Sequence, residues 1–180
     1  MNIGLLSTHN DPLLGRLMHE LAAEELVPLA VILDSKQWSE RDLAIHQERT
    51  EGLLPPIPLH ELQRFRVPFY FVDDHRSPET VRLVDSLGID LLVNAGTPRI
   101  LILQEPLEFQ KKDRYPDVRA KVYRSGQQLL ARAIKLICSR NLRPGLLERQ
   151  GEGRYFPVID DEKLAAVKAK LATGGYAYQR

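Results

Sequence analysis

The sequence predicts an α/β fold, a three-layer Rossmann-like domain in which helices flank a mostly parallel sheet. Short runs of aliphatic and aromatic residues lie at residues 3–6, 28–33, 69–72 and 91–93. Runs that lack polar alternation are typical of parallel strands covered on both faces. Segments with the periodicity of amphipathic helices separate these runs, and this alternation indicates β-α-β units. A chain of 180 residues is long enough to form one such core.

The first two expected helices follow the first two strands. Asp11 followed by Pro12 predicts a helix start, because Asp is a common N-cap and Pro fits the first helical position. The apolar stripe of this helix is formed by Leu13, Leu17 and Leu21. A second helix is expected over residues 38–50, before a proline-rich loop at 53–60.

The third helix precedes the fourth strand. Ser77 and Pro78 predict its start by the same capping argument, and Gly88 is a good C-terminal stop. Its expected inward-facing residues are Val81, Val84 and Leu87. Up to residue 99 the chain therefore has the pattern β-α-β-α-β-α-β.

A crossover is missing between Leu101 and Ile102. Residues 94–101 form a loop after the fourth strand, and residues 102–107 have the pattern of another strand with no helix between the two. Successive parallel strands need a connection of a dozen or more residues. We expect residues 102–107 to pair beside the strand at 91–93, partly closing the gap.

The second half of the chain is expected to be mainly helical. A long helix is predicted over residues 117–139, and Asp160 or Asp161 starts a last helix that ends at Gly174. We expect residues 1–140 to form the α/β domain. Residues 141–180 are expected to be an extension with one helix, packed on the same domain.

Composition narrows the class of protein. Lys and Arg number 25 against 24 Asp and Glu, so no basic excess points to nucleic acid. No apolar run reaches the roughly 20 residues of a membrane span, and the first residues do not resemble a signal peptide. We therefore expect a cytoplasmic location, with no nucleic-acid or membrane partner. The single cysteine, Cys138, is interpreted as a structural thiol on a helix.

Candidate ligand-binding residues follow the strands, because ligands of open α/β sheets bind outside the carboxyl ends. The four segments are residues 7–10, 34–35, 73–76 and 94–99. His9 and Asn10 are candidate substrate-binding residues, although the turn into the first helix explains them equally well. No Gly-rich fingerprint follows the first strand, so a nicotinamide cofactor is not expected.

The histidines outside that turn have less specific interpretations. Asp73, Asp74 and His75 can be metal ligands or an acid–base pair, but a solvated helix-entry loop is the favoured interpretation. The remaining side chains, His19, His46 and His60, are expected at the solvated surface. No metal site is predicted.

The Ala-Gly-Thr-Pro turn within residues 94–101 is the strongest local signal. Its small residues allow the backbone to approach a ligand closely, and its proline fixes the turn. We interpret it as a ligand loop, with a purely structural turn as the alternative.

The chain resembles the 10-formyltetrahydrofolate-dependent formyltransferases, a Rossmann-like family. The resemblance is carried by Val-Asp-Asp-His at residues 72–75, Asn-Ala-Gly-Thr-Pro-Arg-Ile-Leu at 94–101 and Asp-Val-Arg-Ala-Lys-Val-Tyr at 117–123. It implies that 10-formyltetrahydrofolate is the formyl donor and that a small amine, possibly a sugar amine, is the acceptor. The cofactor-binding residues implied are Asn94, Pro98, Arg99, Ile100 and Leu101.

The catalytic part of that family is missing from this chain. Members carry an Asn-x-His element on the next strand and a later Asp, which serve the oxyanion and the amine proton. After Leu101 the sequence has no His, and its only Asn is Asn141. The domain is therefore incomplete relative to the family, and no catalytic residue is assigned.

Three hypotheses follow from this gap. The first is a formyltransferase homologue that has lost catalysis. The second is a non-catalytic module that binds a folate or a nucleotide-like ligand. The third is a scaffold or defective product that self-associates through an exposed sheet edge.

Overall fold

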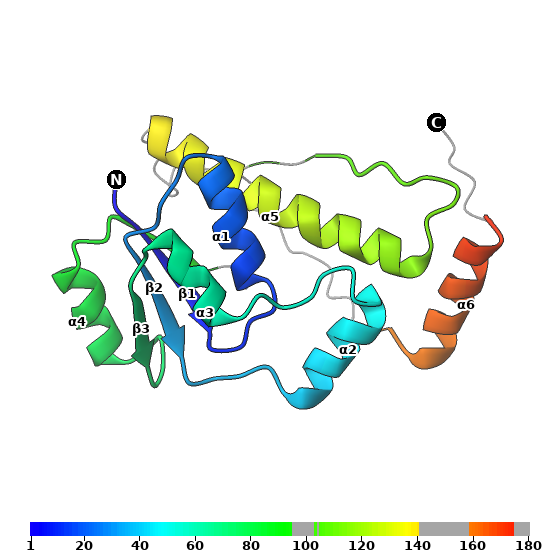
Figure 1. The fold of residues 1–180 in the computed structure, drawn as a ribbon, viewed down its shortest axis with the longest axis horizontal. Helices are drawn as coiled ribbons and strands as arrows, with labels where there is room; N and C mark the ends of the chain where they lie inside the picture. The colour runs from blue at the N-terminus through cyan, green and yellow to red at the C-terminus, as the bar shows by residue number, and fades with distance from the viewer. Residues whose placement is uncertain (95–102, 104, 141–158, 175–180) are drawn as a thin grey trace, which may run out of the picture.

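The computed structural model describes residues 1–94, 103, 105–140 and 159–174 (Figure 1). The strands are β1 (Ile3–Thr8), β2 (Ala30–Asp34), β3 (Phe69–Val72) and β4 (Leu91–Asn94). The helices are α1 (Leu14–Ala23), α2 (Glu40–Thr50), α3 (Leu59–Leu62), α4 (Pro78–Ser86), α5 (Tyr115–Arg140) and α6 (Asp161–Ala172). A 3₁₀ turn, η1 (Gln63–Phe65), extends α3.

The four strands form one parallel sheet in the order β3-β2-β1-β4. The α/β Rossmann-like class predicted from the sequence is thereby confirmed. The register pairs Thr8 with Asp34 and Asp34 with Val72, and it pairs Leu6 with Asn94. The carboxyl ends of all four strands therefore meet at one edge. The strand order reverses between β1 and β4, which is the position where doubly wound sheets bind ligands.

One face of the sheet is covered by α1, α3 and α5, whereas α4 lies at the other side of the strands (Figure 1). Alternate strand residues such as Leu5, Leu33 and Val93 point to this face and are buried there. Leu17 and Met18 of α1 pack on them, and α5 contributes Ala131 and Ile134 to the same core.

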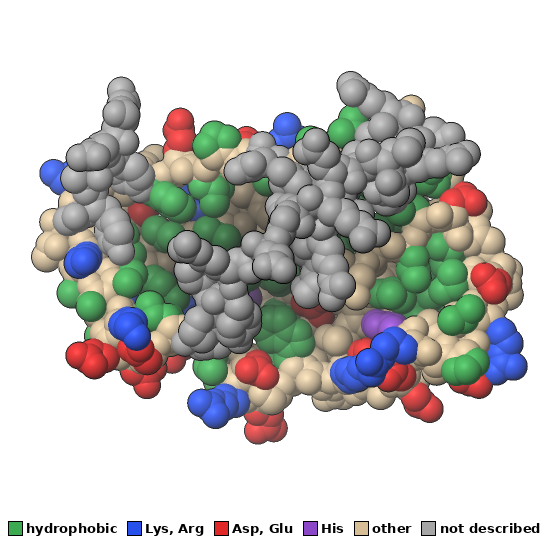
Figure 2. Space-filling view, turned by 180° about the vertical axis from the view of Figure 1, so that it is seen from behind, with side chains coloured by type: hydrophobic (Ala, Val, Ile, Leu, Met, Phe, Trp, Pro, Cys, Tyr) green, Lys and Arg blue, Asp and Glu red, His purple; other side chains and the backbone are tan. Residues whose placement is uncertain are grey.

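The opposite face is covered less completely. The connection from β3 back to β4 places α4 on that side, as the right-handed crossover rule requires (Figure 1). Ile89, after α4, packs so closely on Gly4 that a Cβ there would lie 2.7 Å from its Cδ1. Val81 of α4 and Leu92 of β4 nevertheless remain 54% and 40% exposed. The prediction that Val81 faces inward is therefore wrong. Hydrophobic side chains are visible on this side of the molecule (Figure 2).

Most predicted helix ends are confirmed. The Ser77 and Asp160 side chains cap α4 and α6, with Pro78 at the start of α4. Gly88 and Gly174 follow these helices with φ of +63° and +66°. In α2 the cap is Ser39, so the helix begins after Trp38.

The start of α1 differs from the prediction, because the helix begins at Leu14 and not at Pro12. One carboxylate oxygen of Asp11 accepts the N–H of Leu13 at 2.8 Å, while the other accepts the Ser7 hydroxyl at 2.8 Å. The link to Ser7 ties Asp11 to the end of β1, and the chain makes an additional turn before the helix can start.

The strand expected over residues 102–107 is wrong for the residues of that segment that the structure describes. Leu103 and residues 105–107 have no strand conformation. Pro106 has no N–H to donate to a ladder, and the Glu105 carboxylate pairs with Arg132 of α5 at 2.9 Å. A second strand beside β4 would also need the crossover that this chain lacks.

The last helix lies against the ends of α2 and α5. The Lys168 ammonium is 3.5 Å from the Glu48 carboxylate and 5.8 Å from the centroid of the Tyr115 ring. The predicted domain boundary after residue 140 stays a prediction. Cys138 packs beside the core on α5. Across the described helices, none is both long and apolar enough to cross a membrane.

Candidate functional site

A cavity of about 550 Å³ opens at the carboxyl edge of the sheet. Every strand end or following loop contributes to its wall: Thr8 from β1, Asp34 from β2, His75 after β3 and Asn94 from β4. Gln127 of α5 lines the cavity from the helical layer. The fold therefore places a polar cavity at the position that doubly wound sheets use for ligands.

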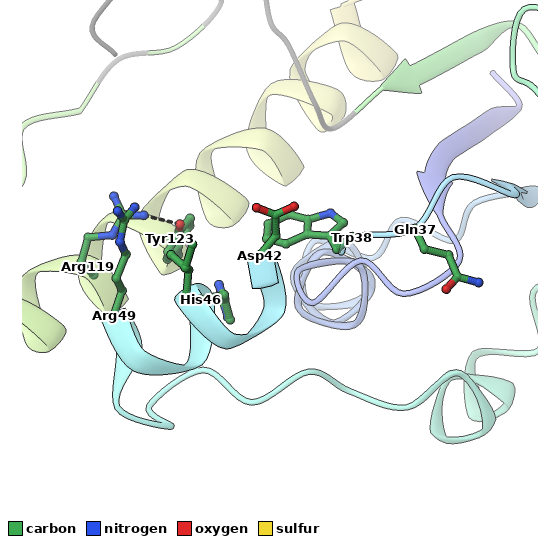
Figure 3. A pocket seen from close by; sticks show the side chains of 8 residues that line it. Gln37, Trp38, Asp42, His46, Arg49, Arg119 and Tyr123 are labelled. Carbon is green, nitrogen blue, oxygen red and sulfur yellow. Dashed lines mark hydrogen bonds between the residues drawn. The ribbon is translucent and has the colours of Figure 1, made fainter. Parts of the chain in front are cut away.

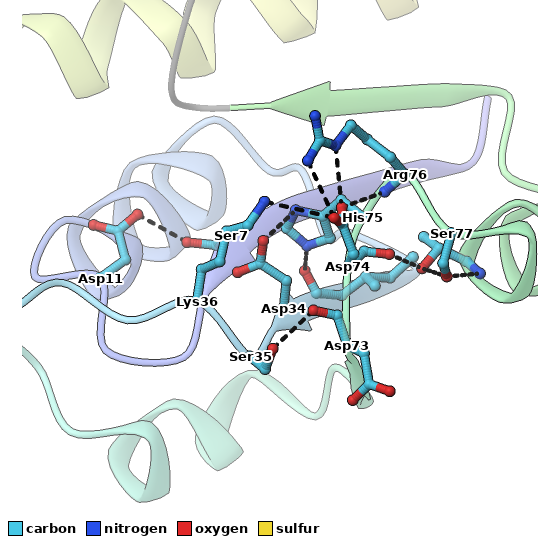
Figure 4. A network of polar contacts seen from close by, with 12 residues as sticks. Ser7, Asp11, Asp34, Ser35, Lys36, Asp73, Asp74, His75, Arg76 and Ser77 are labelled. Atoms are coloured by element: carbon cyan, nitrogen blue, oxygen red, sulfur yellow. Dashed lines mark hydrogen bonds and ion pairs between the residues drawn. The ribbon is translucent and has the colours of Figure 1, made fainter.

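Asp34 and His75 form the most buried polar pair of this cavity (Figure 4). Asp34 ends the fully buried strand β2 and is itself only 4% exposed. The His75 Nδ1 atom lies 3.4 Å from Asp34 Oδ2, and its Nε2 lies 3.0 Å from the Ile32 carbonyl. Because a carbonyl only accepts, Nε2 carries a hydrogen. The ring is thus fixed in orientation between the carboxylate and the strand backbone.

A second, more exposed group of charges lies at the rim. The Arg76 side chain and backbone N–H donate to the Asp74 carboxylate, and these bonds lower the pKa of Asp74 to about 2. Lys36 lies 3.7 Å from the same carboxylate. Asp74 is therefore ionised at neutral pH and neutralised by its neighbours.

Three polar atoms of the cavity residues have no hydrogen-bond partner among the described residues. They are Thr8 Oγ1, Asp34 Oδ1 and Gln127 Oε1, and all three are buried. Gln127 is only 8% exposed, so bulk water does not readily solvate its amide. A buried polar group without a partner costs about 1–3 kcal/mol. Three such acceptors belong to residues that line one cavity, whose wall is therefore rich in hydrogen-bond acceptors.

The residues predicted as cofactor-binding are described only in part. Asn94 lines the cavity beside β1, as a residue at the switch point should. Pro98, Arg99, Ile100 and Leu101 lie outside the described residues. Their predicted contact with a folate stays a prediction.

The two predicted substrate-binding residues lie at the outer side of the same edge. The Asn10 side chain donates to the Trp38 carbonyl at 3.0 Å and accepts the Trp38 N–H at 2.7 Å, which fixes the loop before α2. His9 is exposed, with its ring 5.7 Å from that of Phe71. The structure thus gives Asn10 a structural role, and a role of either residue in substrate binding stays a prediction.

Two features of this region were not expected from the sequence. Residues 34–35 were recognised as a strand end, but the buried pair of Asp34 with His75 was not, because it joins residues far apart in the chain. His75 therefore points inward, whereas the neighbouring Asp73 is exposed, as expected of a helix-entry loop. Nothing in the sequence indicates that Gln127 lines the cavity, since a single polar residue on a long helix usually faces solvent.

The burial of His46 differs from the prediction. It was expected at the surface but is only 4% exposed, because α5 packs across α2. Its Nε2 lies 3.1 Å from the Leu54 carbonyl.

Metal chemistry has no candidate site in the described ranges, where no three His, Cys, Asp or Glu side chains are placed to hold an ion. The fold and cavity define an α/β Rossmann-like protein with a polar site at the topological switch point. Compared with known proteins, the chain matches no family model, no curated protein and no solved structure.

Proposed function

We propose that this chain is a formyltransferase-related protein that binds a small amine at the carboxyl edge of its sheet and does not transfer a formyl group. The observation that carries the proposal is the set of three buried acceptors that have no hydrogen-bond partner among the described residues. An ammonium group has three N–H donors and no acceptor. Its charge is also complementary to the Asp34 carboxylate, whose Oδ1 is one of the three atoms.

The loss of catalysis is proposed from the sequence. Formyl transfer needs donors for the tetrahedral oxyanion and a group that takes the amine proton. The Asn-x-His element of the resembled family has no counterpart after Leu101. Asp34 and His75 lie 3.4 Å apart in the cavity wall, and we assign them to amine binding and not to stabilisation of the oxyanion.

Calorimetric titration with glucosamine tests the binding proposal. N-acetylglucosamine serves as the matched ligand, because acetylation removes the positive charge and two of the three N–H donors. We expect saturable heat with glucosamine only. Asp34→Asn and Thr8→Val should each weaken binding at least about tenfold, whereas Asp85→Asn, an exposed carboxylate on α4, should not. Equal binding of the two sugars, or of Asp34→Asn and the unchanged protein, would contradict the proposal.

Binding of a folate at the same edge is the second candidate, favoured by the position of Asn94 in the cavity wall. Titration with 5-formyltetrahydrofolate, a stable analogue, tests it, and the absence of saturable heat would end it. Incubation with 10-formyltetrahydrofolate and glucosamine tests the loss of catalysis. Formylated amine above the uncatalysed rate would show that catalysis is retained.

A further inference from the structure

A second cavity, of about 390 Å³, lies between α2 and α5 and shares only Trp38 with the lining of the amine site (Figure 3). The helices bring together residues from distant parts of the chain: His46 and Arg49 from α2, Arg119 and Tyr123 from α5. Trp38, in the loop before α2, forms another part of the wall.

Three aromatic rings form part of the wall of this cavity, those of Trp38, His46 and Tyr123. The His46 ring lies 6.1 Å from the Trp38 ring, edge-on at 90°, and 5.5 Å from the Tyr123 ring at 50°. Aromatic rings arranged edge-to-face or tilted offer both faces and edges to a further ring. The His46 Nε2 donates to the Leu54 carbonyl, so Nδ1 is an acceptor in the neutral ring. This Nδ1 is buried and has no partner in the described part of the chain.

One end of the cavity carries two guanidinium groups, those of Arg49 and Arg119 (Figure 3). Neither forms an ion pair within the described ranges, although Arg16, Arg82 and Arg132 elsewhere do. The Arg119 guanidinium stacks over the Tyr123 ring at 4.7 Å and donates to the Tyr123 hydroxyl. Its Nε is buried and has no hydrogen-bond partner in the part of the chain that the structure describes.

The other end carries the Asp42 carboxylate, which accepts the Ser39 hydroxyl at 2.6 Å. Charge therefore changes sign along the cavity, from two guanidiniums to one carboxylate. A ligand with an anionic group would be oriented with that group at the arginine end, because Asp42 repels it from the other.

We propose that this cavity binds a small aromatic acid, with its carboxylate or phosphate on Arg49 and Arg119. Two guanidiniums offer fixed forks of N–H donors that match the oxygens of either anion. The ring packs against the aromatic wall of Trp38 and Tyr123.

Trp38 is the only tryptophan of the chain and lines this cavity, so its fluorescence responds to a ligand here. Trp38 also lines the amine site, so the arginine variants below assign the change to this cavity. The probes are benzoate, phenyl phosphate and neutral benzyl alcohol, with inorganic phosphate as the anion without a ring. We expect at least one aromatic anion to saturate the fluorescence change. Benzyl alcohol and inorganic phosphate should bind at least about tenfold more weakly. Whether benzoate or phenyl phosphate binds more tightly identifies the anion class.

Arg49→Gln and Arg119→Gln should each weaken binding of the aromatic anion at least about tenfold. Arg41→Gln is the matched control, because Arg41 is an exposed arginine on the same helix that does not line the cavity. Circular dichroism confirms that each variant is folded. The proposal is overturned if neither aromatic anion saturates, if inorganic phosphate binds as tightly, or if Arg41→Gln weakens binding as much as the folded Arg49→Gln.

Discussion

Gly15→Ala should destabilise the protein, although alanine is the better helix former. In a helix interior the replacement of Gly by Ala normally stabilises by about 1 kcal/mol, which is the upper bound for Gly15 as the second residue of α1. At Gly15 the new Cβ would lie 2.4 Å from Ile57 Cβ and 3.0 Å from Ile57 Cδ1. The first contact is to an atom attached to the backbone, and Ile57 lies between Pro56 and Pro58, whose fixed φ angles limit how far the loop can move.

The expected size follows from two opposing contributions. Overpacking of a close contact costs about 1–3 kcal/mol, and the gain in helix propensity offsets about 1 kcal/mol of it. We expect a net loss of up to about 2 kcal/mol in the free energy of unfolding. Urea denaturation followed by circular dichroism measures it as a lower midpoint with an unchanged slope.

Gly126→Ala is the matched control. Gly126 lies on the exposed side of α5, and a Cβ there meets no atom within 4 Å. This variant should be more stable by about 0.5–1 kcal/mol. If Gly15→Ala is stabilised as much as Gly126→Ala, the close approach of α1 to the proline-rich loop does not exist in solution.

Three further predictions concern titration and capping. Burial by itself raises the pKa of Asp113, but the Lys121 ammonium and the backbone N–H of Gln110 lower it below its ordinary 3.8. Ionised Asp113 therefore stabilises the fold above pH 3.8, and this is lost as pH falls below that value. Asp113→Asn should lower the free energy of unfolding by about 1–2 kcal/mol at neutral pH. When the urea midpoint is plotted against pH, its fall toward acid pH should be smaller in this variant than in the unchanged protein. An equal fall in the two proteins would contradict the prediction. Burial, together with the Arg64 and Arg16 guanidiniums, lowers the pKa of His19 below 6.5. His19 therefore stabilises the fold in its neutral form above pH 6.5, and this contribution to the free energy of unfolding decreases as the pH falls below 6.5. An NMR titration that placed this pKa above 6.5 would contradict the packing. Ser77→Ala removes the acceptor for the Thr80 N–H at 3.2 Å and should lower the free energy of unfolding by about 1 kcal/mol. Ser77→Asp keeps an acceptor and should change the unfolding temperature little. Equal unfolding temperatures for the two variants would show that the cap is unimportant.

Features that depend on neighbours in the sequence could be predicted. The strand runs, the Ser77–Pro78 helix start and the glycine stop at Gly88 each depend on residues a few positions apart. The parallel α/β class follows from their alternation. The carboxyl edge as the place of the site follows from the class alone.

Features that depend on distant contacts could not be predicted. His46 is buried because α5 covers α2, and nothing near His46 in the sequence indicates this. The helix α1 starts at Leu14 and not at Pro12 because the Ser7 hydroxyl donates a hydrogen bond to the Asp11 carboxylate. Gln127 entered the site through the packing of α5 on α1. The acceptor set of the cavity therefore became visible only when these segments were placed in space.

The packing of α5 against α1 also bears on how the chain folds. Leu17 and Ile134 share one core, although nearly the whole sheet lies between them in the sequence. Closing so long a loop is entropically slow, so the sheet cannot cover its main apolar face until the second half of the chain has joined it. Until then, β1 and β2 expose a surface that favours aggregation. We expect refolding to be limited by the docking of α5, with substitutions at Ile134 slowing it most.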